Sequence, residues 1–300
     1  MKQSHFAELL DAVSLRDDGV IAMLRAYFDA SRLDNGILAI AGIAFGLDRA
    51  KSAERALRLI FGERYCHMTD LHNRKGAFEG IGDEEADRLC RGAIGIINEY
   101  ASAHVAISCD VPAVEALGIR EAKPQSTPLV DGFRHAYPCC LHWAMCAMGD
   151  VVGKQRNSGI AYWFELGDDF QGQARNFLSH IAKPDNKPLR DAYQHESDVF
   201  APKEKAPLFG LADVLAWEWA RHVSATGSGR QTRKSLAAVM NGHSCRTDQG
   251  IPFFKASNKY AIHYTGWPMD KFFDRLRRVM LSSSMDEMVA IRDETPAIRE

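Results

Sequence analysis

Short apolar runs and longer amphipathic stretches follow one another along most of the chain. Segments 21–29 and 37–45 are apolar runs of strand length, and the pair Asn35-Gly36 between them favours a tight hairpin turn. We therefore expect these two segments to be antiparallel neighbours in one sheet. Segments 103–110 and 158–169 are further strand-like runs, and each of them leads into acidic residues.

Helical periodicity fills most of the remaining chain. Apolar residues recur at spacings of three and four, which indicates amphipathic or buried helices. The predicted helices cover 48–64, 82–102, 135–152, 170–182 and 208–224. Segments 111–132 and 183–207 are rich in Pro, Gly or polar residues and are predicted to be connections.

This order of elements predicts an α/β fold with a mixed sheet flanked by helices. Residues 1–20 are predicted to form an N-terminal helical arm. Residues 21–300 are predicted to form a single domain with a C-terminal helical extension that includes 269–281. No internal repeat, low-complexity tract or long linker divides the chain.

Composition and charge narrow the class of protein. The chain is 46% hydrophobic and 25% charged, as in ordinary globular proteins, and its formal charge of −2 gives no overall attraction to nucleic acid or to anionic membranes. Its seven cysteines are odd in number and irregularly spaced, which favours free thiols in a reducing compartment. Segment 1–20 is acidic and lacks a signal-peptide pattern, and no apolar run is long enough to span a bilayer. A cytoplasmic location is therefore predicted.

Three carboxylates stand out because they lie in apolar elements. Asp29 is expected to close the first strand, Glu165 follows a late aromatic strand, and Asp213 lies inside an apolar helix. An isolated buried carboxylate costs roughly several kcal/mol and tends to take up a proton. Several together are stabilised by shared Mg²⁺ or Mn²⁺, and a pair of such ions is a common device for cutting phosphodiesters.

A structural interpretation of each acid stays open. Asp29 also suits a strand that ends in a solvated turn, and Glu165 runs directly into Gly-Asp-Asp, which suits a turn as well. Asp213 is harder to explain in this way, because Arg221 lies two helical turns away rather than one.

Two groups of thiols and imidazoles raise the question of other chemistry. Cys66, His67 and His72 suggest a zinc site, but no paired Cys or His spacing elsewhere completes one, so a hydrogen-bonded loop is favoured. A Cys–His hydrolase is conceivable, but no nucleophile motif is present. In the predicted helix 135–152, the thiols and the imidazole that could act together lie on related faces. They are Cys139, His142 and Cys146, and we expect them to pack in the core.

A basic segment offers contacts to a phosphate backbone. Segment 227–235 resembles a phosphate loop, but the Gly required before Lys234 is Arg233, so the Walker pattern fails. Arg230, Arg233 and Lys234 nevertheless suit nucleic-acid phosphates, with a solvated loop as the alternative. The aromatic run at 217–219 is expected to pack in the core.

Four short segments, in this order, resemble the bacterial family catalogued as domain of unknown function 3800, whose fold is similar to that of ribonuclease H. The segments are "YFDASR" (27–32), "ILAIAGIAF" (37–45), "CHMTDL" (66–71) and "LFGLADVLA" (208–216). The resemblance spans roughly residues 23–220. It implies a ribonuclease H-like α/β fold and a metal-dependent nuclease.

The resemblance also implies roles for particular residues. It makes Asp29 the first metal ligand, Glu165 the acid of the late strand and Asp213 the last ligand. His67 would assist by positioning a phosphate or water, and Asp70 would stand in for a Glu of the family pattern. Together these roles predict two-metal-ion hydrolysis of nucleic acid with Mg²⁺ or Mn²⁺.

Two departures from the family pattern leave a second function open. Ala30 stands where the pattern has Glu, and Gly210 stands where it has Gln. The alternative is therefore a catalytically silent nucleic-acid-binding or regulatory module with the same fold. Asp70, or Asp110 at the end of segment 103–110, is a possible additional ligand.

Overall fold

The computed structural model describes residues 24–116, 136–153, 159–167, 171–184, 187–227, 234–240, 244–246, 252–256 and 259–264. The predicted arm at 1–20 and the predicted helix at 269–281 lie outside these residues, so both stay predictions.

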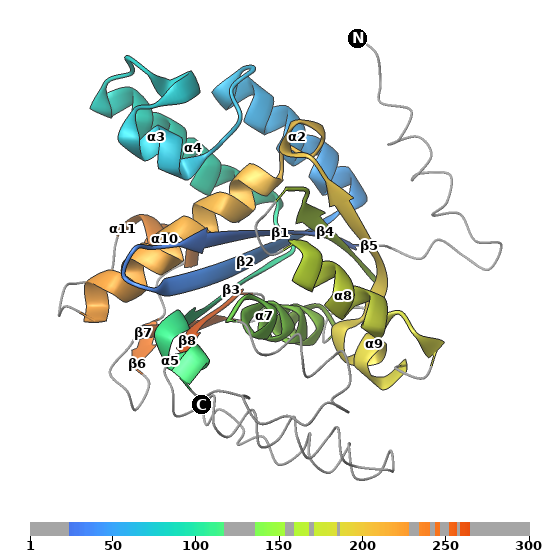
Figure 1. The fold of residues 1–300 in the computed structure, drawn as a ribbon. Coiled ribbons are helices and arrows are strands. Elements are labelled where there is room, and N and C mark those ends of the chain that lie inside the picture. Colours follow the sequence, from blue (N-terminus) through green and yellow to red (C-terminus); the bar gives the residue numbers. More distant parts are fainter. Residues whose placement is uncertain are drawn as a thin grey trace.

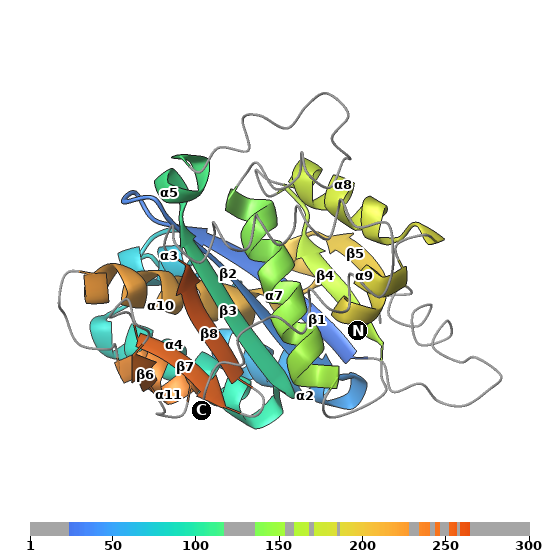
Figure 2. The same ribbon diagram turned by 90° about the horizontal axis from the view of Figure 1, so that it is seen from below.

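A mixed sheet runs through the middle of the molecule (Figures 1 and 2). Across the described residues its strands lie in the order β5-β4-β1-β2-β3-β8-β7-β6. The strands are β1 Leu24–Arg32, β2 Ile37–Gly46, β3 Ala103–Asp110, β4 Ile160–Glu165, β5 His195–Ala201, β6 Ser244–Arg246, β7 Pro252–Ala256 and β8 Lys259–Tyr264. β1 is antiparallel to β2 and parallel to β4, and β4 is parallel to β5. The hairpin predicted around Asn35-Gly36 is confirmed.

Helices cover both faces of this sheet (Figure 1). One face carries α2 Leu47–Phe61, α3 Met68–Asn73, α4 Asp83–Tyr100, α10 Phe209–Gly227 and α11 Lys234–Met240. The other carries α5 Val111–Ala116, α7 Ala136–Gly153, α8 Gln171–Ile181 and α9 Lys187–Tyr193. Short 3₁₀ turns occur at η1 Gly76–Phe78 and η4 Lys203–Lys205. The predicted α/β class, with a mixed sheet flanked by helices, is confirmed.

Successive residues of the central strands enter different cores. Tyr27 and Trp163 belong to the core under α10, whereas Phe28 and Phe164 belong to the core under α7. This follows from the two-residue period of a strand. β2 is buried along nearly its whole length, which explains why its sequence is an uninterrupted apolar run.

The prediction that Asp29 closes the first strand is wrong. β1 continues to Arg32, and Asp29 is paired with Ala41 of β2. The pairing between β1 and β4 does end just before Asp29, because its last pair is Phe28 with Phe164. The strand continues because β2 still offers hydrogen-bonding partners on its other side.

The predicted connections contain regular structure as well. Segment 183–207 holds α9, β5 and η4, and the connection after β3 begins with α5. β5 was missed because its sequence, HESDVFA, lacks the apolar residues of a central strand. Its place at the edge of the sheet explains that polarity. No helix within the described ranges has the length and apolar character to cross a bilayer.

Candidate active site

Asp29 and Glu165 are neighbours because β1 and β4 are parallel. Each residue lies one register position past the last pair of these strands. Each also lies two residues beyond a side chain of the core under α10, namely Tyr27 and Trp163. Because strand side chains alternate with a period of two, both carboxylates face the α10 side of the sheet.

Asp213 reaches the same place from the helix above. Packing of the Phe209 ring 5.7 Å from the Tyr27 ring brings the first turns of α10 over β1. Asp213 lies in the second turn and is only 5% exposed. Its Oδ2 accepts a hydrogen bond of 2.7 Å from the backbone N–H of Met68, at the start of α3. This contact joins α3 to α10 and fixes the orientation of the carboxylate.

The electrostatics indicate that the three acids lie within reach of one another. Burial raises the pKa of Asp29 well above its usual range, and the charges of Asp213 and Glu165 raise it further. Burial also raises the pKa of Asp213 to about 6, against the Met68 N–H, His67 and Lys203, which favour the ionised form. Two carboxylates with raised pKa values and a third acid beside them are typical of a functional site.

Lys203 supplies a cation to this acidic group. Its Nζ lies 2.8 Å from Oε1 of Glu165, whose side chain is 13% exposed. Burial alone would lower the pKa of Lys203, but Glu165, Asp29 and Asp213 outweigh burial and raise it. No sequence pattern points to this residue, because it follows an edge strand within a segment that was predicted to be a connection.

Tyr65 was not predicted as a site residue either. Its buried hydroxyl has no hydrogen-bond partner among the described residues. Burial raises the pKa of this hydroxyl, and so do the charges of Asp29, Asp213 and Glu165. Its hydrogen-bonding capacity therefore lies close to the acids and is unused within the described part of the chain. No local motif marks Tyr65; only the fold brings it to the site.

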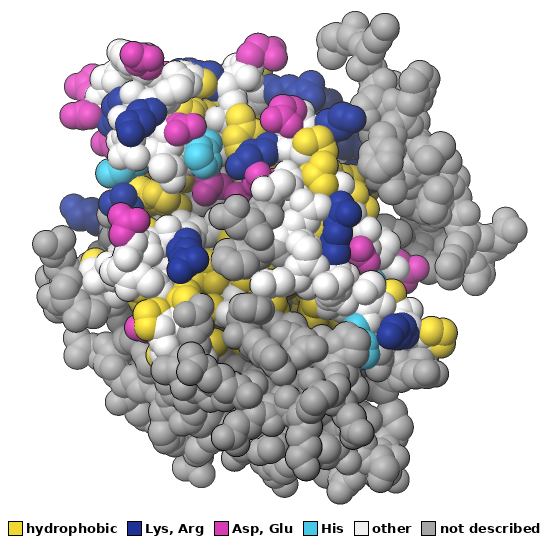
Figure 3. All heavy atoms as spheres, viewed as in Figure 1, with side chains coloured by type: hydrophobic (Ala, Val, Ile, Leu, Met, Phe, Trp, Pro, Cys, Tyr) yellow, Lys and Arg dark blue, Asp and Glu magenta, His cyan; other side chains and the backbone are white. Residues whose placement is uncertain are grey.

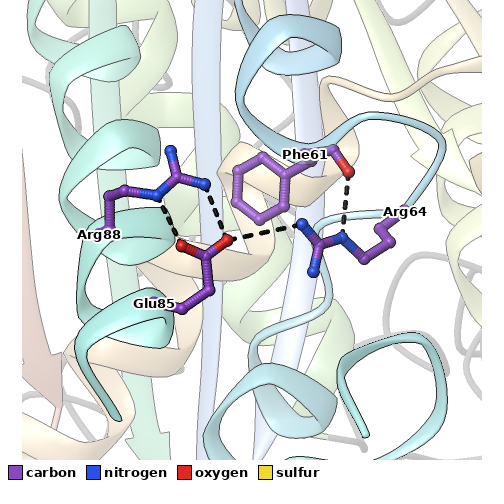
Figure 4. Close-up of polar contacts among 4 residues, drawn as sticks. All are labelled: Phe61, Arg64, Glu85 and Arg88. Atoms are coloured by element: carbon purple, nitrogen blue, oxygen red, sulfur yellow. Dashed lines mark hydrogen bonds and ion pairs between the residues drawn. The ribbon is translucent and has the colours of Figure 1, made fainter. Parts of the chain in front are cut away.

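Arginine contacts hold the segment that carries Tyr65 (Figure 4). Arg64 donates from Nε to the carbonyl oxygen of Phe61 at 3.2 Å and lies 3.7 Å from the carboxylate of Glu85. Glu85 in turn accepts two hydrogen bonds from Arg88, at 2.7 and 2.8 Å. The segment between α2 and α3 is therefore tied to the first turns of α4.

The assisting residues lie at the border of the site. His67 precedes α3, and its Nδ1 lies 2.9 Å from Oδ2 of Asp70. The carboxylate of Asp70 is therefore paired with His67 at the border of the site. Asp110 is paired as well: it accepts a hydrogen bond of 2.9 Å from the N–H of Ala113 at the start of α5.

Of the predicted phosphate-contacting residues, Lys234 alone falls within the described residues. It is exposed and begins α11, whereas Arg230 and Arg233 lie outside the described residues. Lys234 is followed by Ser235, whose hydroxyl donates a hydrogen bond of 2.7 Å to Glu218 of α10, so the start of α11 lies beside the middle of α10.

The donor chemistry of the three acids fits a divalent ion, but their arrangement is incomplete. Carboxylate oxygens are the ligands that Mg²⁺ and Mn²⁺ prefer. Among the described His, Cys, Asp and Glu side chains, however, no three are grouped so as to hold one metal ion. The same finding gives no support for a zinc site at Cys66, His67 and His72.

A second polar cluster lies on the opposite face of the sheet, in the core under α7. Nδ1 of His142 lies 2.5 Å from the hydroxyl of Tyr193, and Nε2 lies 3.7 Å from Sγ of Cys146. Burial lowers the pKa of His142 to about 3 and raises that of Cys146 to about 12. Both groups are therefore neutral near pH 7, which agrees with the core interpretation. Cys139 is fully buried as well.

The aromatic run predicted to pack in the core does so. Trp217 and Trp219 belong to the core under α10, and Glu218 between them is buried. The carboxylate of Glu218 accepts a hydrogen bond of 2.7 Å from Ser235, which joins α10 to α11.

Both departures from the family pattern have local structural explanations. A Cβ at Gly210 would lie 2.6 Å from the carbonyl oxygen of Cys66, so α10 approaches that segment too closely for a side chain. Ala30 packs toward the core under α7, so a longer side chain at this position would point away from the acids. Its N–H donates to Oδ1 of Asp29 at 2.7 Å and helps to orient that carboxylate.

Figure 3 shows the surface around the helices that cover this site. Acidic side chains lie in a depression near the middle of the face, between the α2–α4 helices and the sheet, with a histidine and basic side chains around it. Asp29 and Glu165 are only partly buried, whereas Asp213 is buried. The acidic group is therefore open to solvent on the side of the two strands.

No protein-family model matches the sequence, and no curated protein matches it. Similar solved structures include ribonuclease H2 from Pyrococcus horikoshii OT3, with 11% identity over 90% of this chain and 99% of that chain and a TM-score of 0.36. Ribonuclease HII from Archaeoglobus fulgidus, in a complex with PCNA, has 16% identity over 73% and 87%, with a TM-score of 0.33. A mutant protein of Bst-RNase HIII has 11% identity over 73% and 66%, with a TM-score of 0.36. These values are low, so the proposals below depend on the residues of this chain.

Proposed function

We propose that the chain is a divalent-cation-dependent phosphodiesterase that acts on nucleic acid. The observation that carries this proposal is the convergence of Asp29, Glu165 and Asp213 from two strands and a helix. Membership of the family catalogued as domain of unknown function 3800 stays a prediction from the four sequence segments, as does a cytoplasmic location.

In this proposal the three acids hold the cation. An Mg²⁺ or Mn²⁺ ion held by these acids would supply an activated water and would stabilise the oxygen that leaves the phosphorus. The protein orients its ligands through the backbone: Ala30 donates to Asp29, and Met68 donates to Asp213. His67, 36% exposed at the border of the site, is placed to position a phosphate or a water molecule.

The basic segment has a different role from the acids. Lys234, with Arg230 and Arg233, is proposed to contact the nucleic-acid backbone, which supplies affinity without sequence preference.

The experiment incubates the purified chain with labelled single- and double-stranded DNA, RNA and a DNA–RNA hybrid. Cleavage should require Mg²⁺ or Mn²⁺ and stop with EDTA. Asp29→Asn and Asp213→Asn should each remove the activity, whereas Asp87→Asn, an exposed acid of α4, should keep it. Full activity in both site variants, or cleavage in EDTA, would overturn the proposal.

A second candidate is a nucleic-acid-binding or regulatory module that does not cleave. It is favoured by the lack of a three-ligand group among the described side chains and by the contact between Lys203 and Glu165. Calorimetry with Mn²⁺ separates the candidates, because a silent module should show neither saturable metal binding nor a Mn²⁺-dependent rise in Tm.

A further inference from the structure

We infer that Arg221 and His72 form a phosphate-contacting subsite that binds the nucleic-acid backbone next to the acidic site. The inference deepens the proposed function and rests on it for the identity of the ligand, an anionic phosphodiester chain. The two residues belong to α10 and α3, and both pack against the ring of Trp217.

The subsite is built by two helices that run side by side in the same direction. At the start of α3, the backbone N–H of Met68 donates a hydrogen bond of 2.7 Å to Asp213 of α10. Four residues further along each helix, the His72 ring lies 5.0 Å from the Trp217 ring. Because residues four apart lie on one face of an α-helix, these two contacts hold α3 along α10 from the acid to His72.

Arg221 continues the same face of α10, one turn beyond Trp217. Its Cζ lies 4.2 Å from the centre of the Trp217 ring, which is a cation–π contact. The ring is only 3% exposed, so it holds the guanidinium in place and lowers the entropy cost of binding an anion. Stacking uses none of the five N–H donors of a guanidinium, and these donors match the oxygens of a phosphate.

The charges around this subsite favour a phosphate group. His72 is exposed and Arg221 is partly exposed, so both side chains reach solvent. Glu218, which lies between Trp217 and Arg221 in the sequence, is buried and accepts a hydrogen bond from Ser235. Its carboxylate therefore faces α11 rather than the surface that His72 and Arg221 share.

The spacing along α10 predicts how much of the backbone is contacted. Arg221 lies eight residues after Asp213, which is about 12 Å along the helix axis at about 1.5 Å per residue. Successive phosphates of one duplex strand are about 3.4 Å apart along the duplex axis. A strand that follows α10 would therefore span the distance from Asp213 to Arg221 with about three to four nucleotides.

Arg175 provides a matched control on the other face of the sheet. Its Cζ lies 4.8 Å from the centre of the Phe200 ring, and its helix, α8, packs into the core under α7 (Figure 1). Arg221→Met and Arg175→Met therefore each remove one positive charge and one contact between an arginine and an aromatic ring. Only Arg221→Met removes them on the face that carries the acids.

The test measures the binding of labelled oligonucleotide duplexes of DNA, of RNA and of a DNA–RNA hybrid by fluorescence anisotropy. EDTA prevents metal-dependent cleavage, and the salt concentration is varied. For the duplex that wild type binds most tightly, Arg221→Met should raise the Kd about tenfold and reduce the slope of log Kd against log salt by about one. Arg175→Met should change neither quantity. His72→Glu should also raise the Kd about tenfold, because it places a carboxylate beside the phosphate.

The possible outcomes separate the subsite from the proposed function. An unchanged Kd and salt slope in folded Arg221→Met, equal changes in Arg175→Met, or no binding of any duplex by wild type would overturn the subsite. Only the absence of cleavage with Mg²⁺ and Mn²⁺ would overturn the phosphodiesterase, and weaker binding by Arg221→Met in such a chain would still support the subsite. If Arg221→Met does not fold, His72→Glu decides by the same Kd, since His72 is exposed.

Discussion

The two faces of the sheet each carry a cluster of chemically competent side chains, and the clusters differ in what burial does to them. Under α7, His142 contacts both Cys146 and Tyr193, and burial leaves the imidazole and the thiol uncharged. Under α10, Asp29 and Asp213 are also penalised by burial, but Lys203 and backbone N–H groups favour their ionised forms.

The difference lies in the partners rather than in the residue types. Both clusters combine groups that sequence motifs associate with catalysis. The cluster under α7 pairs its polar atoms with neutral partners. The acidic cluster instead places carboxylates beside the ammonium of Lys203 and beside a Tyr65 hydroxyl that has no partner among the described residues. A polar group that is buried and uncompensated is costly, so it points to a ligand or a function more strongly than a satisfied one does.

The largest expected effect is the loss of metal-dependent cleavage when an acid of the cluster under α10 is replaced. Asp213→Asn keeps an oxygen that can accept from the Met68 N–H but removes the negative charge. We expect metal-dependent cleavage to fall by more than about 100-fold, a size typical for loss of one electrostatic catalytic group. Initial rates on the best nucleic-acid substrate check this.

The matched control for that prediction comes from the other face. His142→Gln should keep cleavage within about twofold of wild type, since its partners Tyr193 and Cys146 belong to the core under α7. A comparable loss of activity in both variants, with both still folded, would erase the proposed distinction between the clusters.

Two glycines test the packing that supports each cluster. A Cβ at Gly210 would lie 2.6 Å from the Cys66 carbonyl oxygen, and a Cβ at Gly149 would collide with the carbonyl oxygen of Ala192, beside Tyr193. We expect Gly210→Ala and Gly149→Ala each to lower the free energy of unfolding by about 1–3 kcal/mol. Urea denaturation measures this.

The glycine variants should differ in function. At temperatures where both are folded, Gly210→Ala should weaken Mn²⁺ binding, because it displaces the segment that leads to Tyr65 and Met68. Gly149→Ala should leave it unchanged. Equal Mn²⁺ affinities in the two variants would show that the close approach of α10 does not shape the acidic site.

The pH dependence of stability should have opposite signs in the two clusters. His142 has a folded pKa of about 3 and an ordinary value of 6.5, so the unfolded chain binds more protons between these values and stability rises with pH. Between pH 5 and 7 this contributes about 2 kcal/mol. Asp213 has a folded pKa of about 6 against 3.8, so the folded chain binds more protons and stability falls with rising pH, by about 1 kcal/mol.

Single substitutions at His142 and at Asp213 test these two contributions to the pH dependence of stability. Urea denaturation at pH 5 and 7 in metal-free buffer should show a smaller rise in stability with pH for His142→Gln than for wild type, and a larger rise for Asp213→Asn. His104, whose pKa burial also lowers to about 3, is present in all three proteins and cancels in the comparison. Identical pH dependence in the three proteins would contradict the assignment.

The smallest expected effect concerns Cys146. Because burial raises the pKa of its thiol to about 12, the thiolate is scarce at pH 8, and the thiolate is the reactive form. Peptide mapping after iodoacetamide treatment of the folded chain should find Cys146 unmodified under conditions that alkylate a free thiol. Cys146→Ala should cleave nucleic acid at the wild-type rate; rapid alkylation or lost cleavage would reopen a Cys–His mechanism.

Much of the fold follows from local sequence patterns. The apolar run of β2 and the Asn35-Gly36 turn predict the central hairpin, and the periodicity of 208–224 predicts α10. β5 was not predicted as a strand, because an edge strand needs fewer apolar residues than a central one and the sequence HESDVFA therefore resembles a loop.

The candidate site was predictable only in part. Asp29, Glu165 and Asp213 stood out because each carboxylate interrupts an apolar element, a local feature. Tyr65 and Lys203 interrupt nothing, and they become partners of the acids only when the α2–α3 segment and η4 fold against the sheet. Site residues of this kind can be recognised only from the tertiary structure.

The polar strand β5 has a consequence for the behaviour of the protein in a crowded solution. It forms an outer edge of the described sheet, where unpaired backbone groups invite another chain to add a strand. Its exposed residues are Glu196 and Asp198, so two copies approaching edge to edge would bring like charges together. The same polarity that hid this strand in the sequence thus protects the sheet against fibrillar self-association.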